Sequence, residues 1–461
     1  MLIMPKNNWK NEFAEFVHEI MEEFEIPGMS VGLSQNGEVI YSEGFGYADL
    51  ENEKKVNPET VFGIASITKS FTALAIMILE REGKLTTGDP VLKYLPDFDA
   101  GEKITPAINI HHFLTHTAGL PPTPALMYAM VRSIEGDPTA EKLKEDGKWE
   151  KWTEEPPIES YKDLLDFWAR NKPEPLGYPG GQFSYSNDAY SLLGTIVERI
   201  SGISLGEFME EKIFKPCNLE KITFSPDELK KWPNVTQLYA KIDEEIVPAP
   251  KWNHSEAMLG AGFLKTHALD LLRYGQSFLG SAYLKRMGSP YFPLPDGKFY
   301  GYGFMVQPDY RGNTIIEHGG SLKGISSHLG MVPEENLVAT VLINLVEMPV
   351  TRVWDALVNL ALGYSIEEER FSFSALASLP ESSRDWPGKY VSPEGAEIEV
   401  TSEEEKLFVE FNNKKQELTP VAVDRASLIR RGEKSIIQFL RDGEGKVSGI
   451  HMGLRIIKKV N

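Results

Sequence analysis

The last part of the chain alternates between short apolar runs and turn residues, and no other feature constrains the fold as closely. From Trp386 onward about eight such runs follow one another within about 75 residues. Strands this short and this evenly spaced are typical of a small closed antiparallel barrel. The predicted strands are Gly388–Ser392, Ala396–Thr401, Leu407–Phe411, Leu418–Val423, Ser427–Ile429, Ser435–Leu440, Val447–His451 and Arg455–Val460.

The barrel accounts for only part of the chain. Its 461 residues exceed the size at which a single core stops growing, about 250–300 residues. After Gly363 the composition turns polar and then rich in small residues, which is typical of a linker. We therefore predict a first domain over residues 1–367, a linker over 368–384 and the barrel domain over 385–461.

The start of the chain predicts an α+β class for the first domain. Residues 8–25 carry apolar side chains at helical spacing, and Pro27-Gly28 ends this predicted helix. Asn36-Gly37 then lies between two strand-like runs, which indicates an antiparallel β-hairpin and not a parallel βαβ unit. Residues 121–179 are expected to form a surface insertion with one short helix near 162–170.

Charge and cysteine content exclude several functions. The formal net charge of −19 argues against nucleic acid and against an anionic membrane, since phosphate binding needs a basic surface. Because Cys217 is the single cysteine, the sequence excludes an intrachain disulfide and a zinc site made of cysteines. No apolar run has the length of a membrane span or of a signal peptide, so we expect a cytoplasmic protein.

Ser66-Ile67-Thr68-Lys69 opens the clearest helical pattern in the chain, residues 66–82, and is its only Ser-x-x-Lys sequence. Residues i and i+3 share a helix face, so the Lys69 amine can reach the Ser66 hydroxyl. A serine needs a base beside it at neutral pH, and lysine serves as that base only when its amine is neutral. Burial disfavours the ammonium form, and a helix N-terminus offers N–H groups to an oxyanion.

Tyr185-Ser186-Asn187 is the only Tyr-x-Asn sequence in the chain. A tyrosine near Lys69 could lose its proton in the field of a cation and relay protons to and from Ser66. The amide of Asn187 would meet Lys69 or a substrate carbonyl. The same segment also predicts a turn into a helix over 189–200, with Asn187 or Asp188 as its cap, and the two interpretations are compatible.

His318-Gly319-Gly320-Ser321 follows a strand-like run over residues 313–317. Two glycines after a strand let a ligand approach the backbone closely. The N–H of Ser321 could then be the second oxyanion donor, opposite the N–H of Ser66. His-x-Gly also occurs at His328 and His451, which we expect to be ordinary sheet residues.

In this order, Ser-x-x-Lys, Tyr-x-Asn and His-x-Gly resemble the serine β-lactamase and penicillin-binding superfamily. Within it the chain is similar to the class C-like branch, which includes D-alanyl-D-alanine carboxypeptidase B, D-aminopeptidases, esterases and archaeal serine-peptidase relatives. The resemblance spans the chain from about residue 10 to residue 365. Stretches that support it are Gly44–Asp49, Leu114–Pro121, Gly260–Gly262 and His318–Gly324.

The resemblance implies a β-lactamase/transpeptidase-like domain, with an antiparallel sheet, helices on both faces and an all-helical lobe. It implies Ser66 as nucleophile, with Lys69 and Tyr185 as the proton-transfer pair. The residues that would bind substrate or its oxyanion are Asn187, His318, Gly320 and Ser321. The predicted barrel resembles the small lipocalin-like barrels appended to D-aminopeptidases.

One departure bears on the substrate. β-Lactamases of this branch usually carry Lys-Thr-Gly where the chain has His318-Gly319-Gly320, so a lysine charge and a threonine hydroxyl that help hold a carboxylate are missing. We therefore expect a serine peptidase, of aminopeptidase or carboxypeptidase type, acting through an acyl-enzyme on peptide or ester bonds, D-amino-acid peptides included. A β-lactamase or penicillin-binding protein, an esterase and a non-catalytic scaffold are the alternatives. No metal or organic cofactor is expected, and a homo-oligomer stays open.

Overall fold

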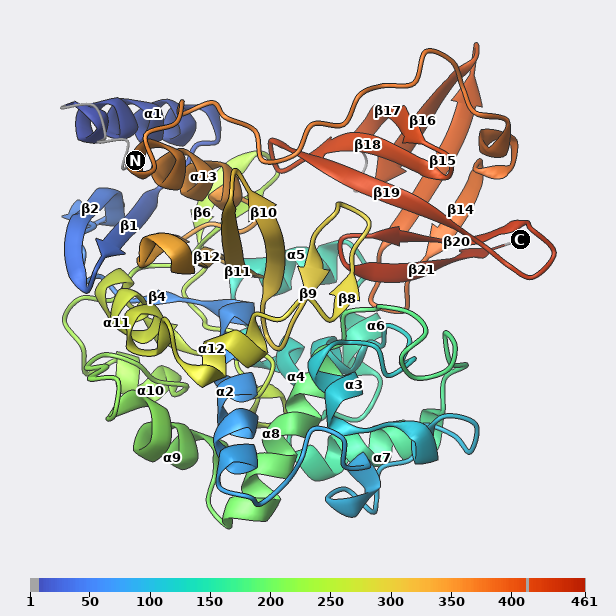
Figure 1. Ribbon diagram of the computed structural model, residues 1–461, viewed down its shortest axis with the longest axis horizontal. Coiled ribbons are helices and arrows are strands. Elements are labelled where there is room, and N and C mark those ends of the chain that lie inside the picture. Colours follow the sequence, from blue (N-terminus) through green and yellow to red (C-terminus); the bar gives the residue numbers. More distant parts are fainter. Residues whose placement is uncertain (1–7, 412–413, 461) are drawn as a thin grey trace.

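The core of the first domain is one antiparallel sheet, described by a computed structural model that covers residues 8–411 and 414–460 (Figure 1). Within these residues the sheet has nine strands, in the order β3-β2-β1-β13-β12-β11-β10-β9-β8. They are β1 (Gly28–Gln35), β2 (Glu38–Asp49), β3 (Lys54–Lys55), β8 (Phe292–Pro293), β9 (Phe299–Tyr300), β10 (Met305–Tyr310), β11 (Asn313–Leu322), β12 (Ile325–Val332) and β13 (Leu337–Ile343).

The predicted hairpin at Asn36-Gly37 joins β1 to β2 and is confirmed. Both turn residues have positive φ, 52° at Asn36 and 83° at Gly37, as the turn of a two-residue hairpin requires. On its other side β1 pairs with β13, the last strand of this sheet along the chain. The beginning and the end of the domain therefore meet near the centre of the sheet.

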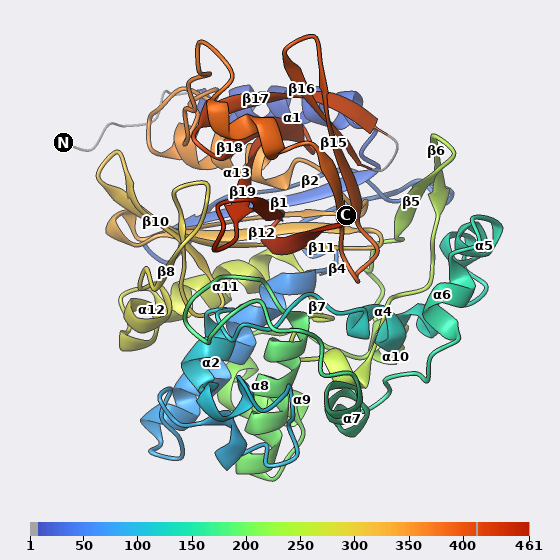
Figure 2. The same cartoon turned by 90° about the vertical axis from the view of Figure 1, so that its right-hand side faces the viewer.

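Helices cover both faces of the sheet, as the α+β class predicts (Figure 2). On one face α1 (Trp9–Glu23) and α13 (Val350–Ala361) pack together and bury a common apolar cluster. On the other face α11 (Ala268–Phe278) lies against β1 and β13. Beyond α11, a helical lobe is built around α2 (Thr68–Arg81) and α8 (Asn187–Ser201).

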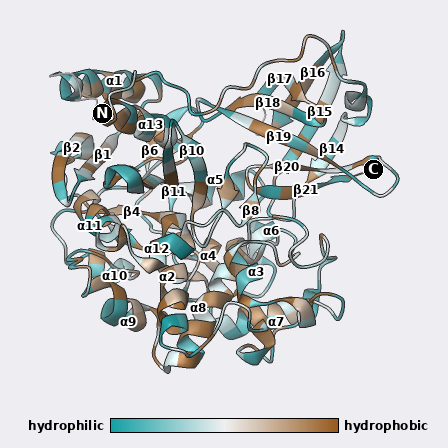
Figure 3. Ribbon diagram, in the orientation of Figure 1, coloured by the Kyte–Doolittle hydropathy of each residue, from teal (hydrophilic) through white to brown (hydrophobic). Residues whose placement is uncertain are grey.

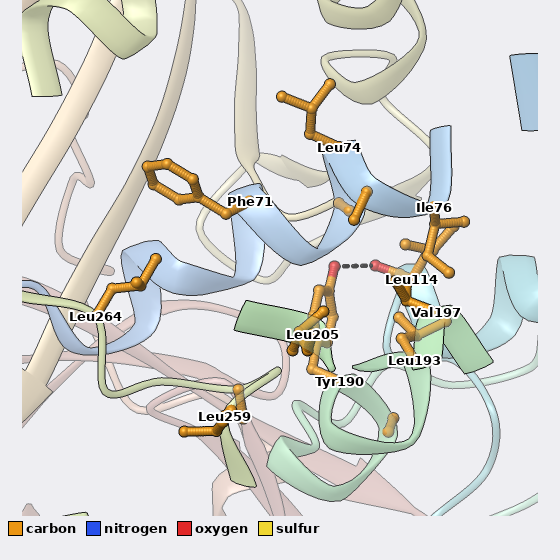
Figure 4. Close-up of a cluster of buried hydrophobic side chains, with 14 of the residues drawn as sticks. Phe71, Leu74, Ile76, Leu114, Tyr190, Leu193, Val197, Leu205, Leu259 and Leu264 are labelled. Atoms are coloured by element: carbon orange, nitrogen blue, oxygen red, sulfur yellow. Dashed lines mark hydrogen bonds between the residues drawn. The ribbon is translucent and has the colours of Figure 1, made fainter. Parts of the chain in front are cut away.

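The centre of the helical lobe is the contact between α2 and α8. Their buried apolar side chains form one cluster, which Figure 4 shows with Phe71, Leu74, Ile76, Leu193 and Val197 among its members. A hydroxyl buried at this depth costs free energy unless it is hydrogen-bonded. Tyr190 meets this requirement, because its hydroxyl donates to the carbonyl of Leu114 at 2.7 Å.

Residues 121–179 form four α-helices where the sequence predicted one: α4 (Ala125–Met130), α5 (Pro138–Glu145), α6 (Trp149–Thr153) and α7 (Tyr161–Asn171). The last is the helix predicted near 162–170 and is confirmed, whereas the other three were not predicted. The first three are too short to show a helical period in the sequence, and helices of that length need tertiary support. Asp137, which caps α5, also accepts hydrogen bonds from Lys251 and Lys323.

Shorter elements connect the layers: β4 (Phe62–Gly63), α3 (Ile110–Leu114), α9 (Leu205–Met209), α10 (Pro226–Leu229), β5 (Tyr239–Ile242), β6 (Glu245–Pro248), β7 (Lys265–Thr266) and α12 (Ala282–Met287). β4 pairs with β7, and β5 pairs with β6. Among the described helices, none is both long enough and apolar enough to cross a membrane.

The predicted C-terminal barrel is confirmed: within the described part of the chain, eight antiparallel strands close on themselves. They are β14 (Gly388–Val391), β15 (Glu397–Glu403), β16 (Lys406–Phe411), β17 (Lys414–Ala422), β18 (Arg425–Arg430), β19 (Glu433–Arg441), β20 (Val447–Met452) and β21 (Arg455–Val460). Polar and apolar residues alternate along these strands (Figure 3), as a barrel filled by side chains requires. In the core, Trp386 stacks on Phe439 with 4.1 Å between ring centroids.

A buried ion cluster fixes the segment between α13 and the barrel to the sheet. The guanidinium of Arg370 lies 2.8 Å from Glu317 of β11 and 2.8 Å from Asp355 of α13. Lys298 places a second cation 2.8 Å from Glu317. Burial acts to raise the pKa of Glu317, but Arg370 and Lys298 outweigh it and hold that pKa well below its ordinary value.

Glu317→Gln should lower the free energy of unfolding by about 3–5 kcal/mol, because it leaves buried cations without their partner. The stabilisation from a carboxylate with a depressed pKa is complete above the unfolded pKa, about 4.3, and is lost as pH falls toward the folded value. The melting temperatures of Glu317→Gln and the parent protein should therefore differ at pH 7 and begin to converge as the pH falls below about 4.

Scanning calorimetry across that pH range measures the melting temperature of each protein. Glu15→Gln, on the exposed side of α1, is the matched control. It should change the free energy of unfolding by less than about 0.5 kcal/mol, and so leave the melting temperature close to that of the parent. A difference between Glu317→Gln and the parent that stays constant with pH would contradict a depressed pKa.

Candidate active site

Ser66 lies in a tight helical turn, Ala65–Ile67, that leads directly into α2. The turn is fixed by its neighbours, since β4 pairs with β7 and the N–H of Ile64 donates to the carbonyl of Leu264 at 3.0 Å. Ala65 has φ = +43°, a left-handed conformation that costs free energy for a residue with a side chain. The backbone is therefore strained immediately before the predicted nucleophile.

Lys69 points from α2 into the same region, with its side chain fully buried. Its Nζ atom lies 2.7 Å from the carbonyl of Ala261, 2.8 Å from Oδ1 of Asn187 and 3.3 Å from Oγ of Ser66. Burial is the main cause that lowers the pKa of Lys69 well below its ordinary value. Burial therefore favours the neutral form of the Lys69 amine.

A neutral amine has two N–H donors and one lone pair. The two shortest contacts, to Ala261 and Asn187, are made to acceptors and take the two donors. The lone pair is then left for the O–H of Ser66, at 3.3 Å. This is the arrangement that a general base for the Ser66 hydroxyl requires.

Tyr185 closes the other side of this group. Its ring centroid lies 4.7 Å from Nζ of Lys69. Burial raises the pKa of Tyr185 above its ordinary range, while the Ser66 hydroxyl and the Arg455 guanidinium lower it in part. Resting Tyr185 is thus a neutral phenol, and not the ionised group considered from the sequence, because burial outweighs the nearby cation.

Asn187 does not cap α8, which corrects the cap predicted from the sequence. The cap is Ser186, whose hydroxyl accepts a hydrogen bond from the N–H of Ala189 at 3.1 Å. Asp188 is buried and accepts hydrogen bonds from the side chains of Thr123 and Trp168. The amide of Asn187 is therefore free of a capping role and can bind Lys69.

Gly320 brings β11 against the nucleophile turn. A Cβ atom at this position would lie 2.3 Å from the carbonyl oxygen of Ile64 and 3.0 Å from the N atom of Ser66. Only glycine permits this approach. Ser321 follows on β11 and lines the cavity in front of Ser66, on the strand where the second oxyanion donor was predicted.

His318 has its side chain behind the cavity, 2% exposed, within a chain of hydrogen bonds. The N–H of Ser186 donates to Nδ1 of His116 at 3.0 Å, so the proton of His116 is on Nε2, 3.1 Å from the Tyr300 hydroxyl. Nδ1 of His318 lies 2.6 Å from the carbonyl of Gly319 and must donate to it, which leaves Nε2 to accept from Tyr300 at 3.1 Å.

Each donor in this series of hydrogen bonds meets one acceptor, so both histidines are neutral and each has a defined tautomer. Burial is the main cause that lowers the pKa of His116 well below its ordinary value and that of His318 to about 3. These hydrogen bonds link the Tyr185 segment to β11. No pattern in the sequence pointed to His116 or Tyr300 as partners of His318.

A cavity of about 250 Å³ lies in front of Ser66. Its lining includes Ser66, Tyr185, Asn187 and Ser321, so the structure brings these four predicted residues together. Two further lining residues, Glu394 and Arg455, come from the barrel, and no pattern in the sequence pointed to either of them. In the described residues no group of three or more His, Cys, Asp or Glu side chains is placed to hold a metal ion.

Tyr300→Phe removes the hydroxyl that joins the two histidines. It leaves the Nε2–H of His116 without an acceptor and Nε2 of His318 without a donor, at about 1–3 kcal/mol for each unpaired buried group. We expect a lower melting temperature and changed imidazole ¹⁵N shifts for His116 and His318.

Tyr302→Phe is the control, because the Tyr302 hydroxyl binds a different histidine, His111, at 2.7 Å. Its ¹⁵N spectrum should change at His111 alone. If Tyr300→Phe left the ¹⁵N shifts of His116 and His318 at their parent values, the chain of hydrogen bonds would be wrong.

Comparison with known proteins gives the family of the chain. The family model described as Beta-lactamase matches residues 13–362. Penicillin-binding protein 4* of Bacillus subtilis (strain 168) is 23% identical over 435 residues, which are 88% of this chain and 88% of that protein. The octameric penicillin-binding protein homologue from Pyrococcus abyssi is 27% identical with a TM-score of 0.71, covering 97% of this chain and 99% of that chain.

A class C beta lactamase from Rhodobacter sphaeroides shares the fold, with a TM-score of 0.60 at 20% identity over 76% of this chain and 98% of that chain. The family match contains the Ser66 turn, the Tyr185 segment and the His318 strand in one continuous domain. The chain therefore belongs to the beta-lactamase family, within the superfamily of serine β-lactamases and penicillin-binding proteins.

Proposed function

We propose that the chain is a serine peptidase or esterase that works through an acyl-enzyme on Ser66. The observation that carries the proposal is the position of the buried Lys69 amine, which lies 3.3 Å from Oγ of Ser66 and is held by Ala261 and Asn187. Lys69 takes the Ser66 proton as Oγ attacks the substrate carbonyl carbon. The N–H groups of Ser66 and Ser321 would hold the oxyanion.

Tyr185 completes the proton route. As a neutral phenol it gives its proton to the leaving amine or alcohol, and it recovers a proton from Lys69. Water then attacks the acyl-enzyme, and the same groups return Ser66 to its O–H form. Over the full cycle one ester or amide bond and one water are consumed, and no proton is gained or lost.

The cavity favours substrates without a large net charge. On β11 the chain has His318 and Gly319 in place of a lysine and a threonine, and the His318 side chain is buried away from the cavity. Arg455 is paired with Glu394 at 2.8 Å, so the two barrel charges offset each other. These features support peptide and ester substrates, including peptides with D-residues, over a β-lactam ring.

Ser66→Ala should reduce ester and aminoacyl-amide hydrolysis by at least about 10³-fold, because no other group replaces the nucleophile. Intact mass after exposure to mixed L- and D-peptide amides and esters should show one adduct, located on Ser66 in the parent and absent from Ser66→Ala.

Ser70→Ala is the matched control. Ser70 is on the same helix, but its hydroxyl is buried and donates to the carbonyl of Ile67, so hydrolysis should persist. Unchanged hydrolysis by Ser66→Ala would overturn the proposal. Fast turnover of a chromogenic cephalosporin would indicate a β-lactamase instead, and a stable penicilloyl adduct a penicillin-binding protein.

Asn187→Asp tests the state of Lys69. It places a carboxylate where the amide oxygen now lies, 2.8 Å from Nζ, and an adjacent anion favours the charged amine. The acid limb of kcat/KM against pH should move upward by about 1–3 pH units. Asn171→Asp, an exposed position on α7, should leave the limb in place. An unmoved limb in Asn187→Asp protein that still forms the adduct would show that Lys69 is not the base.

We also infer that the chain assembles with copies of itself. The inference rests on the Pyrococcus abyssi homologue, which is described as octameric and aligns over 97% of this chain. Light scattering should give a multiple of 51.7 kDa at micromolar concentration. A single species with the mass of one chain would contradict the inference.

A further inference from the structure

The barrel reaches the candidate site at two places, the β20–β21 hairpin with Arg455 and the β14–β15 turn with Glu394. Figure 1 shows this hairpin reaching from the barrel toward β8 and β9. The N–H of Tyr185 donates to the carbonyl of Leu454 at 2.9 Å, and the N–H of Ile456 donates to the hydroxyl of Ser184 at 3.4 Å. The backbone of the barrel hairpin therefore hydrogen-bonds the Tyr185 segment on both sides of Arg455.

Arg455 and Glu394 lie next to Tyr185 as a pair. The Arg455 guanidinium is centred 4.6 Å from the Tyr185 ring, and Glu394 binds it with two contacts, at 2.8 Å and 3.3 Å. The two side chains are 18% and 27% exposed, and both line the cavity. A cation–π contact and a bidentate ion pair fix the guanidinium in one orientation.

We propose that the barrel completes the catalytic centre through these two residues, which act as positioning residues with opposite electrostatic effects on proton transfer between Lys69 and Tyr185. Arg455 favours the two states needed for turnover, a neutral Lys69 and a proton-donating Tyr185, and Glu394 opposes them. The inference rests on the proposed function, because it assigns a task to residues beside the Lys69–Tyr185 pair.

The electrostatic argument follows from sign and distance. A cation disfavours the ammonium form of Lys69 and stabilises the anion left when Tyr185 gives up its proton, and an anion does the reverse. Burial dominates the pKa of both groups, but Arg455 lowers and Glu394 raises each of them. At an effective dielectric of about 20, removing one charge beside such a pair should move its titration by about 0.5–1.5 pH units.

Other groups that face Tyr185 do not compete with this effect while they are neutral. They come from several elements and are Ser66, His116, Tyr190, Tyr300 and His318. Asp188 is the exception, because burial raises its pKa to about 6 and both barrel charges act on it. Its titration would move in the same directions as that of Lys69, so the experiment repeats the comparison in Asp188→Asn protein.

The experiment measures kcat/KM against pH in the full chain, with the ester that acylates Ser66. Arg455→Gln should move the acid limb upward by about 0.5–1.5 pH units, and Glu394→Gln should move it downward by a similar amount. The double variant removes both charges, and its limb should lie near that of the parent. Arg455→Lys keeps the charge, so its acid limb should lie at the same pH as that of the parent. The opposite shifts of Arg455→Gln and Glu394→Gln should persist when both are made in Asp188→Asn protein.

A structural control separates positioning from stability. Arg441→Gln breaks an ion pair with Asp424 and Asp385 in the barrel, away from the cavity lining. It should lower the melting temperature without moving the acid limb. The single variants at Arg455 and Glu394 also leave one partly buried charge, so melting is recorded for every variant.

The inference fails if the acid limbs of Arg455→Gln and Glu394→Gln move in the same direction, or if neither limb moves while activity falls with melting temperature. It also fails if the opposite shifts disappear in Asp188→Asn protein. Failure of the proposed function is a different result, because the parent protein would then form no adduct on Ser66.

Discussion

The buried amine of Lys69 sets the requirements for everything around it. An ammonium ion in this position would lose several kcal/mol of hydration, whereas a neutral amine loses much less. The three nearest oxygens, on Ala261, Asn187 and Ser66, carry no charge, so no anion in direct contact favours the ammonium form. The free energy of the fold and the chemistry of the site therefore favour the same protonation state.

β11 separates two electrostatic environments. Successive side chains of a strand point to opposite faces, so Glu317 and His318 face different layers. Glu317 meets Arg370 and Lys298, a fully charged cluster near α13. His318 accepts a hydrogen bond from Tyr300 and belongs to a series of hydrogen-bonded groups that carry no net charge. Keeping the charged cluster on the far side of the strand prevents it from shifting the protonation of Lys69.

The sequence predicted those parts of the fold whose signals are local. Asn36-Gly37 specifies a turn by itself, and the barrel strands alternate regularly enough to be placed within a few residues. Likewise, Ser66 and Lys69 stand one helical turn apart in any helix that begins near Ser66. Helices α4, α5 and α6 were missed because contacts from distant residues, such as Lys323 on Asp137, stabilise them.

The candidate site was harder to predict because the residues around Ser66 and Lys69 come from elements that are far apart in the sequence. Ser186 rather than Asn187 caps α8, and both residue types are good caps, so only the Lys69 contact distinguishes them. The pairing of Tyr300 with His116 and His318 depends on the register of β9 and β11 against the turn after α3. Arg455 lies in the last strand of the chain, and its position beside Tyr185 follows only from how the barrel docks.

That docking is strong enough to hold a charge in place. Arg370 is buried against Glu317, Glu433 of β19 accepts from the N–H of Arg352 at 2.9 Å, and Leu454 accepts from Tyr185. Contacts spread over the linker, β19 and the β20–β21 turn resist rotation about any single one of them. A barrel held only by a flexible linker could not keep a guanidinium 4.6 Å from an aromatic ring. The barrel is thus fixed at the distance where the charges of Arg455 and Glu394 influence Tyr185.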